Sequence, residues 1–291
     1  MLCVSERFDF DEIEFKDQFL DKQPIIYRNI SNDWSAVRHW SPNYFKQACP
    51  DIDITVKYFK PKGVEVKHST MSEYVDLLDA NLGNSKTLKA EEVPYCHDIP
   101  IFWQAPQLIQ DVETFPVNAL PKFYQQNWQQ FVQFFMSPAG AVTPLHFDTL
   151  RSQNLFFQIK GEKCFSLIPW KDRAKCLRRG WRWFDFDPED KNQLALPEFS
   201  DVEIVKVNIK EGDVLYIPAG MLHHVRTLED SISFNIDFHT KRSVVSSFLG
   251  GFENMPAENH RYNWLCARGL FTRMSQESFF KGYKHYLNYV S

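Results

Sequence analysis

Apolar residues in the middle of the chain fall into short runs separated by turn residues. Between about residues 126 and 239 the runs are Phe131–Met136, Asn154–Ile159, Cys164–Ile168, Val202–Val207, Val214–Ile217 and Ile232–Phe238. Runs of this length, bounded by glycine, proline and charged residues, are typical of strands in an antiparallel sandwich or barrel. The hydrophobic pattern therefore predicts a mostly β fold for this region.

The flanking regions have a different pattern. Upstream, Gln23–Arg28 and Ile52–Tyr58 are predicted strands, whereas Ser41 and Ser69 stand where helices are expected to begin. Downstream of Ser243, apolar and aromatic residues return at helical spacing. We expect a single domain over residues 1–291, divided into an N-terminal α+β cap (1–120), a catalytic core (121–240) and C-terminal helices (241–291).

Composition excludes several classes of protein. The chain has 291 residues, 44% of them hydrophobic, and a net charge of only −4, so no global basic field favours nucleic acid. Its six cysteines are scattered, unlike those of a small disulfide-stabilised domain. No apolar stretch approaches the roughly 20 residues of a membrane span, and charge appears early, at Glu6 and Arg7. We expect reduced thiols and a cytoplasmic location, or a nuclear one in a eukaryote.

Two motifs carry metal-binding side chains. His146 and Asp148 stand two positions apart, so on an extended strand both project to one face. This pair alone is weak evidence, but the stretch 211–225, a turn, an apolar strand and a bend, ends in His223 and His224. Two imidazoles and one carboxylate leave coordination positions open, as non-haem Fe(II) requires. A structural zinc site would normally add a fourth ligand, usually cysteine, and none has suitable spacing.

The order of the motifs resembles that of the Jumonji-C and cupin-like Fe(II)- and 2-oxoglutarate-dependent hydroxylases, a family that includes protein asparaginyl hydroxylases and tRNA wybutosine hydroxylases. The matching segments are Val142–Asp148, Gln153–Lys163 and Gly212–Pro218, within about residues 94–240. The resemblance implies a double-stranded β-helix (jelly-roll, cupin) barrel with flanking helices. In the family the ligand histidine follows the Ile-Pro proline by five positions, which selects His223 and leaves His224 as a neighbour that packs or forms a hydrogen bond.

The resemblance also implies a cosubstrate site. Lys163 matches the lysine that pairs with the distal carboxylate of 2-oxoglutarate, Thr143 matches a hydroxyl at the same end, and Tyr95 matches a phenol there. Asn154 and Asn235 match amides near the cosubstrate and the metal. The implied cofactors are Fe(II), 2-oxoglutarate and O₂. A buried lysine needs an anionic partner, which is consistent with this role.

One departure from the family concerns the loop after the His-x-Asp motif. Asn154 lies eight residues after His146, where relatives have six, so this chain has two extra residues around 149–152. The loop is expected to border the metal. The role of Asn154 is therefore open between a site residue and a loop amide that satisfies backbone groups.

Substrate class is the least determined property. The resemblance favours hydroxylation of a side chain in a protein or peptide, and the carboxylate of Asp148 favours oxygen insertion over halogenation. A modified tRNA base or a small metabolite would need the same core, and the fold does not decide among them. A non-catalytic cupin binding module is the alternative of another class, although such a module would need neither the three ligands nor Lys163.

One basic and aromatic segment bears on the choice of binding partner. Residues 171–183 are basic and aromatic, with Arg178, Arg179 and Arg182 beside Trp181 and Trp183, and either contact RNA or an acidic peptide or form a solvated face packed on the barrel.

The C-terminal region carries many apolar and aromatic residues, which indicate either a homodimer interface or helices that cap a monomeric barrel. They are Phe248, Phe252, Trp264, Leu265, Leu270, Phe271, Phe279, Phe280, Tyr283, Tyr286, Leu287 and Tyr289.

Overall fold

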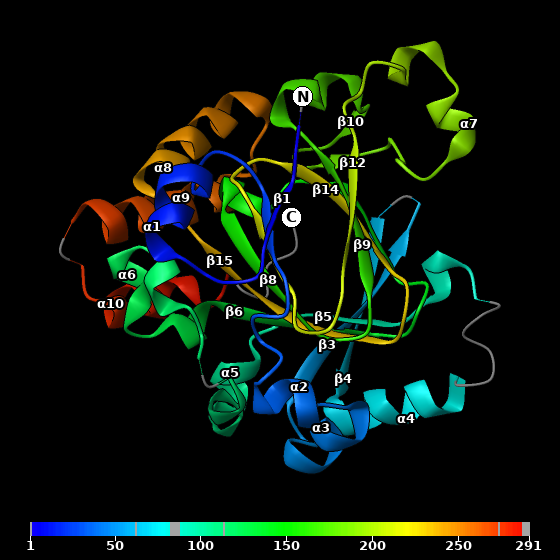
Figure 1. Ribbon diagram of the computed structural model, residues 1–291, viewed down its shortest axis with the longest axis vertical. Helices are drawn as coiled ribbons and strands as arrows, with labels where there is room; N and C mark the ends of the chain where they lie inside the picture. Colours follow the sequence, from blue (N-terminus) through cyan, green and yellow to red (C-terminus); the bar gives the residue numbers. More distant parts are fainter. Residues whose placement is uncertain (1, 62, 82–87, 113, 273, 287–291) are drawn as a thin grey trace.

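The computed structural model describes residues 2–61, 63–81, 88–112, 114–272 and 274–286 as two β-sheets that face each other, with helices around them (Figure 1). In spatial order, the first sheet contains β1 (Ser5–Arg7), β2 (Ile25–Tyr27), β13 (Val214–Ile217), β8 (Gln153–Lys160), β15 (Ser231–Phe238), β6 (Val132–Ser137), β5 (Tyr95–Ile99), β3 (Asp53–Lys60) and β4 (Gly63–Thr70). The second contains β10 (Arg178–Arg179), β11 (Trp183–Phe184), β7 (Val142–His146), β14 (Leu222–Thr227), β9 (Lys163–Ile168) and β12 (Val205–Ile209).

The predicted jelly-roll barrel is confirmed. Strands that are distant in sequence are neighbours, as β14 lies antiparallel between β7 and β9, and β15 lies between β8 and β6. The barrel interior is apolar, with Phe156, Phe165 and Leu215 among its fully or nearly buried residues. Because this interior is filled by side chains, the ligand-bearing strands are held against a packed core.

The expected strand at Val202–Val207 begins later than predicted. β12 starts at Val205, where it pairs with Leu167 of β9. Just before it, the backbone N–H of Glu203 donates to the Asp172 carboxylate, at 3.1 Å, instead of joining a strand ladder. A long-range side-chain contact, which no local pattern encodes, thus sets the strand boundary.

The N-terminal region is not a separate cap on the barrel. β2 pairs with β13 and β5 pairs with β6, so N-terminal strands extend the first barrel sheet at both sides. Ile25 packs in the core between this sheet and the helices, whereas Ile26 faces the barrel interior. Burial on both faces explains why the strand reads as a continuous apolar run.

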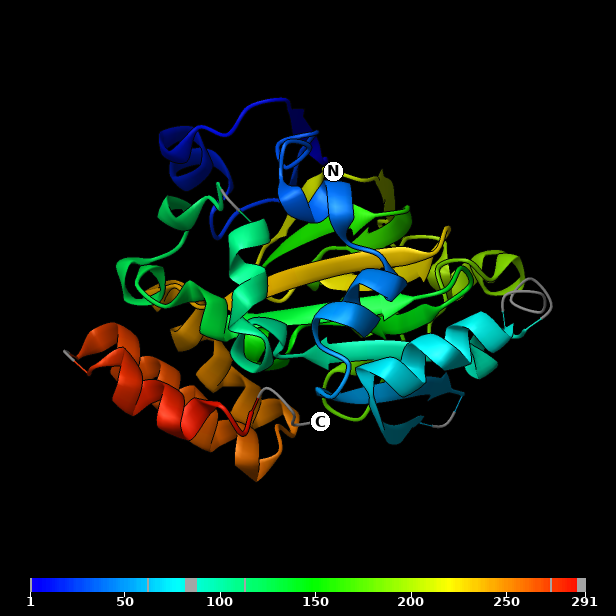
Figure 2. The ribbon, with the colours of Figure 1, turned by 90° about the horizontal axis from the view of Figure 1, so that it is seen from below.

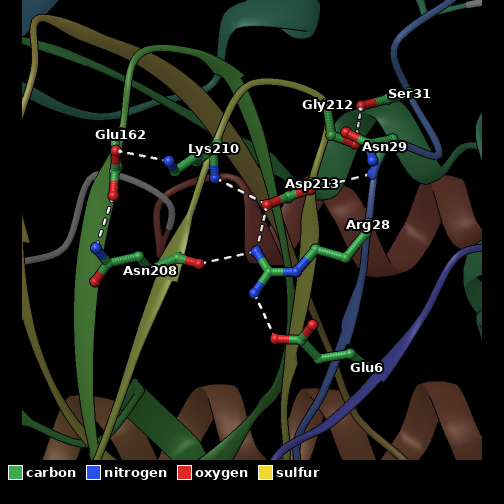
Figure 3. Close-up of polar contacts among 9 residues, drawn as sticks. All are labelled: Glu6, Arg28, Asn29, Ser31, Glu162, Asn208, Lys210, Gly212 and Asp213. Atoms are coloured by element: carbon green, nitrogen blue, oxygen red, sulfur yellow. Dashed lines mark hydrogen bonds and ion pairs between the residues drawn. The ribbon is translucent and has the colours of Figure 1, made fainter.

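A tight turn at Gly212 and Asp213 joins the N-terminal strands to the barrel (Figure 3). Asp213 accepts hydrogen bonds from the Arg28 guanidinium at 2.6 Å, the Asn29 backbone N–H at 3.1 Å and the Lys210 backbone N–H at 2.9 Å. Gly212 has φ +88°, and a Cβ there would collide with the Asn32 side chain at 1.7 Å. Glycine is therefore required at this turn for both backbone conformation and space.

The helices lie outside the barrel. They are α1 (Glu12–Glu14), α2 (Ser35–His39), α3 (Pro42–Ala48), α4 (Met71–Asn81), α5 (Ile101–Gln104), α6 (Lys122–Gln125), α7 (Lys191–Leu194), α8 (Lys241–Phe248), α9 (Ala257–Phe271) and α10 (Gln276–Tyr283). Figure 2 shows the orange and red C-terminal helices together at one end of the molecule, away from the cyan helix α4. Phe279 and Tyr283 of α10 pack on Phe131 at the start of the barrel. Among the described helices, none is both long and apolar enough to span a bilayer.

Candidate metal and cosubstrate site

β7 and β14 bring the three predicted metal ligands together. His146 ends β7 and lies directly opposite His223 of β14. The Asp148 Oδ1 atom lies 3.8 Å from His146 Nε2 and 3.5 Å from His223 Nε2. Asp148 stands just beyond the strand rather than on it, a small correction to the expected strand face, because the buried Phe147 turns toward Trp170 and Trp181.

Both imidazoles are oriented by their own backbone. The Nδ1–H of His146 donates to the Pro144 carbonyl at 2.8 Å, and that of His223 donates to the Met221 carbonyl at 3.2 Å. These hydrogen bonds leave each Nε2 facing Asp148, which is the usual way in which a protein sets the tautomer of a metal-binding histidine.

The charge states of His146 and Asp148 also suit a cation. Burial, with the neighbouring His223 and Arg182, holds the pKa of His146 well below its ordinary value. Burial alone would raise the pKa of Asp148, but the His223 imidazole outweighs it and keeps that pKa below its ordinary value. Neutral imidazole and ionised carboxylate are the forms that bind metals. The donor set of two nitrogens and one carboxylate fits Fe(II).

Asn154 belongs to the site despite the longer loop before it. Its Nδ2 donates to Asp148 Oδ2 at 3.0 Å, which leaves Oδ1 toward the histidines. The loop forms a 3₁₀ turn in which Leu150 and Arg151 have φ of 60° and 52°. Arg151 then donates to the Glu253 carboxylate at 2.9 Å, which holds this end of the loop against the C-terminal region, whereas Thr149 lines the pocket beside the ligands, so the loop borders the site as expected.

Lys163 is buried directly behind Tyr95, which lines the same pocket as the three ligands. Its ammonium donates to the Tyr95 hydroxyl at 2.7 Å, and Tyr95 in turn forms a hydrogen bond with Thr143. The Phe156 and Phe135 rings lie 5.4 and 5.7 Å from the ammonium. Burial lowers the pKa of Lys163 to about 7, and no ion pair offsets it among the described residues. An unpaired buried ammonium is costly, so this end of the pocket favours an anion.

Asn235 also lines the pocket, and it leads to a residue that the sequence reading missed. Its Nδ2 donates to Asp237 Oδ1 at 3.3 Å, and Asp237 lies opposite Asn154 across the strands. Burial, then repulsion from Asp148 and Asp98, raises the pKa of Asp237 well above its ordinary value. Asp237 stands two positions after Asn235 on one strand, so the same two-residue spacing that revealed His146 and Asp148 was available here.

A second group of missed residues comes from β3 and β5. Asp98, with φ 61°, accepts from Lys57 Nζ at 2.5 Å and lies 2.9 Å from His97 Nδ1. Burial lowers the pKa of His97 to about 4. Arg182, from the excursion before β11, lines the same pocket. These side chains come together only through the pairing of distant strands. No short motif in the sequence predicts that they share a site.

His224 faces away from the pocket, as the alternation along β14 requires. Its Nε2 lies 3.8 Å from Asp187 Oδ1. The structure therefore places His223, and not His224, beside Asp148.

The chain is similar in sequence to known cupin-like proteins. Residues 11–243 match the family model described as a cupin-like domain. The chain is 24% identical over 274 residues to the human bifunctional peptidase and (3S)-lysyl hydroxylase JMJD7, covering 81% of this chain and 83% of that protein. It is 26% identical to the zebrafish (Danio rerio) lysine-specific demethylase 8, covering 77% of this chain, and 25% identical to the chicken (Gallus gallus) 2-oxoglutarate and iron-dependent oxygenase JMJD4, covering 79%. It spans only 55% and 58% of the lengths of these last two.

Proposed function

This chain belongs to the cupin-like domain family, and we propose that it acts as an iron(II)- and 2-oxoglutarate-dependent oxygenase that hydroxylates a protein side chain. One observation carries the proposal: a pocket lined by an open three-ligand cluster also has, in its lining, a tyrosine whose hydroxyl accepts from a buried lysine without an ion-pair partner among the described residues. The lysine suits a distal carboxylate and the cluster suits a metal. A purely structural barrel would need neither.

Each end of the pocket would have a distinct task. His146, Asp148 and His223 would hold Fe(II), which together with 2-oxoglutarate and O₂ supplies the oxidising chemistry. Lys163, supported by Tyr95, would bind the distal carboxylate of 2-oxoglutarate through a charge-assisted hydrogen bond. The aromatic rings around that ammonium would exclude water from the bound carboxylate and restrict its orientation.

A basic side chain is the substrate best supported by the rest of the pocket. Two acidic side chains, Asp98 and Asp237, are on its lining, and because Asp98 is already paired with Lys57, Asp237 is the one that favours a further cationic partner. Burial and the charges of Asp148 and Asp98 raise the pKa of Asp237 and the charge of Arg182 only opposes that rise, so a substrate cation beside Asp237 would further favour its ionised form. The names of the human and zebrafish relatives, a lysyl hydroxylase and a lysine-specific demethylase, agree with a basic substrate.

Succinate formation and product mass test the proposed function together. With Fe(II) and 2-oxoglutarate, peptides containing lysine or arginine should stimulate succinate formation, whereas matched peptides with norleucine at that position should not. Mass spectrometry should find one added oxygen, whereas loss of a methyl group would identify demethylation instead. Absence of succinate with every peptide, RNA and metabolite offered would favour the non-catalytic module.

RNA binding by residues 171–183 stays a prediction without further support. Arg178 lies 3.1 Å from the Glu253 carboxylate and Arg179 lies 3.0 Å from the Asp185 carboxylate, so both are already engaged within the chain. Arg182 lines the candidate site. A cytoplasmic or nuclear location likewise stays a proposal.

A homodimer through the C-terminal helices is also proposed, on a narrower surface than the sequence indicated. Phe279, Phe280, Tyr283 and Tyr286 are buried within the chain and therefore cap the barrel. Of the other residues expected there, Leu287 and Tyr289 lie outside the described residues. The exposed apolar residues of α8, α9 and the turn between them, each more than half exposed, are Val245, Leu249, Trp264 and Phe271. An exposed group of this kind supports an interface.

A further inference from the structure

We propose that His224, Asp187 and Glu189 form a second metal site, for a divalent ion such as zinc, on the outer face of the barrel. The three ligand atoms, one per residue, lie within 4.8 Å of one another. Because side chains alternate along β14, His223 faces the pocket and His224 faces the opposite side. There it meets the acidic segment that follows β11. The candidate ions thus lie on opposite faces of one strand.

The geometry of this cluster is close to that of the first site. His224 Nε2 lies 3.8 Å from Asp187 Oδ1, the same separation as that between His146 Nε2 and Asp148 Oδ1. Around a tetrahedral zinc ion with bonds of about 2.0–2.2 Å, ligand atoms lie roughly 3.4 Å apart. The His224–Asp187 pair would need to contract by only a few tenths of an ångström, and the ligand oxygen of Glu189 lies within 4.8 Å of both atoms.

His224 is a buried imidazole without hydrogen bonds among the described residues. The residue is only 2% exposed, and its Nδ1 is buried with no partner. Ser166 lies directly opposite on β9, and its hydroxyl is likewise buried without a partner. Directly paired residues share a face of the sheet, so two unsatisfied polar side chains lie beside the carboxylates. Buried polar groups normally have partners, and a metal would bind the other ring nitrogen, Nε2, which faces Asp187.

The carboxylates are held in place before any ion binds. Asp187 accepts from the Glu189 backbone N–H at 2.8 Å, and the Asp187 backbone N–H donates to the Gln193 side chain at 3.0 Å. Glu189 uses one oxygen to accept from Arg226, which leaves its other oxygen for a ligand bond. The charges of Arg226 and Lys206 act on the same imidazole and oppose a cation, so we expect weaker binding than at the first site.

Such an ion would link two segments of the chain that are distant in sequence. The excursion between β9 and β12 carries Arg182 and Trp183 to the pocket and Asp187 and Glu189 to the outer face. Joining this excursion to His224 of β14 would fix it to the strand that also carries His223. The ion would thereby stabilise the pocket wall without contacting substrate.

Metal stoichiometry of the full-length chain tests the proposal. After chelation and reloading with Zn²⁺ alone, elemental analysis should find two ions per chain in the wild type and one in the Asp187→Asn, Glu189→Gln double variant. Asp185→Asn, an acidic residue of the same segment that pairs with Arg179, is the matched control and should keep two. The His146→Ala, Asp148→Ala double variant should keep one ion.

The outcomes separate the two sites. If the wild type binds one ion and the His146→Ala, Asp148→Ala variant binds none, the second site is rejected while the first stands. If the wild type binds one ion that only the Asp187→Asn, Glu189→Gln variant loses, the second site is supported and the first is rejected. Two ions retained in the Asp187→Asn, Glu189→Gln variant would also overturn the proposal. In the His146→Ala, Asp148→Ala variant, Zn²⁺ should raise the melting temperature, and adding Asp187→Asn should remove that rise.

Discussion

The pocket inside the barrel and the surface of the C-terminal helices differ in how their side chains are held. In the pocket, Lys163 and His146 each have a fixed hydrogen-bond partner and almost no exposure. On α9, Trp264 and Phe271 are more than half exposed, although the neighbouring α10 is firmly packed on the barrel. The contrast fits the two proposals, chemistry inside the barrel and assembly at the helical surface. Substitutions in the pocket should therefore affect turnover, and substitutions on the helical surface should affect the mass of the assembly in solution.

The largest effect is expected at the metal ligands. His146→Ala or Asp148→Ala should abolish succinate formation while leaving the melting temperature nearly unchanged, because these side chains hold the ion rather than the core. His39→Ala, at an exposed histidine on α2, is the matched control and should retain full turnover. Normal turnover in both ligand variants would reject His146 and Asp148 as metal ligands. The proposed difference between a catalytic barrel interior and a helical surface would then fail as well.

The next effect is at the other end of the pocket. Lys163→Ala should raise the KM for 2-oxoglutarate without lowering the iron content, because the lysine lies at the end proposed to bind the distal carboxylate and not at the metal ligands. A charge-assisted hydrogen bond contributes about 1.5–3 kcal/mol, which corresponds to a roughly 10- to 150-fold loss of affinity. An unchanged KM in steady-state kinetics would exclude this role.

The pH dependence of cosubstrate binding gives a finer test. Lys163 has its pKa lowered to about 7, and the dianion binds its protonated form, so affinity should fall as the pH rises above 7. Between pH 6.5 and 8.5 the protonated fraction, and hence the affinity, should fall roughly 20-fold. Calorimetry would measure this. Lys163→Arg, which stays charged throughout, should bind with little change over this range; an equal fall in that variant would place the titrating group elsewhere.

The smallest effect on turnover is expected outside the barrel. Trp264→Glu should convert a dimer to a monomer near 34.3 kDa by light scattering, and succinate formation should change little. Phe8→Glu, at an exposed aromatic residue far from α9 in the sequence, is the matched control. A point variant is preferable to truncation, because Phe279 and Tyr283 cover the barrel. A wild-type mass near that of one chain at micromolar concentration would refute the dimer.

Local pattern determined much of this protein. The strands β8, β9, β13 and β15 coincide with apolar runs that are bounded by turn residues. Such runs can be recognised from the sequence because hydrophobic alternation and turn preferences act over a few neighbouring positions. His146, Asp148 and the pair His223–His224 could be predicted for a related reason, since these residues stand in short motifs next to apolar strands, and the family resemblance then selected His223. Lys163, Tyr95 and Thr143 followed from resemblance, and the structure brings these three together.

The tertiary structure alone decided what depends on pairing between distant strands. Lys57 and Asp98 meet because β3 lies beside β5, and Asp187 meets His224 because an excursion of the chain folds back over β14. The N-terminal strands join the barrel sheet for the same reason, since β13 offers an unpaired edge that β2 fills. Hydrophobic period is encoded within a few residues, whereas the choice of partner across a sheet is made by packing of the whole chain.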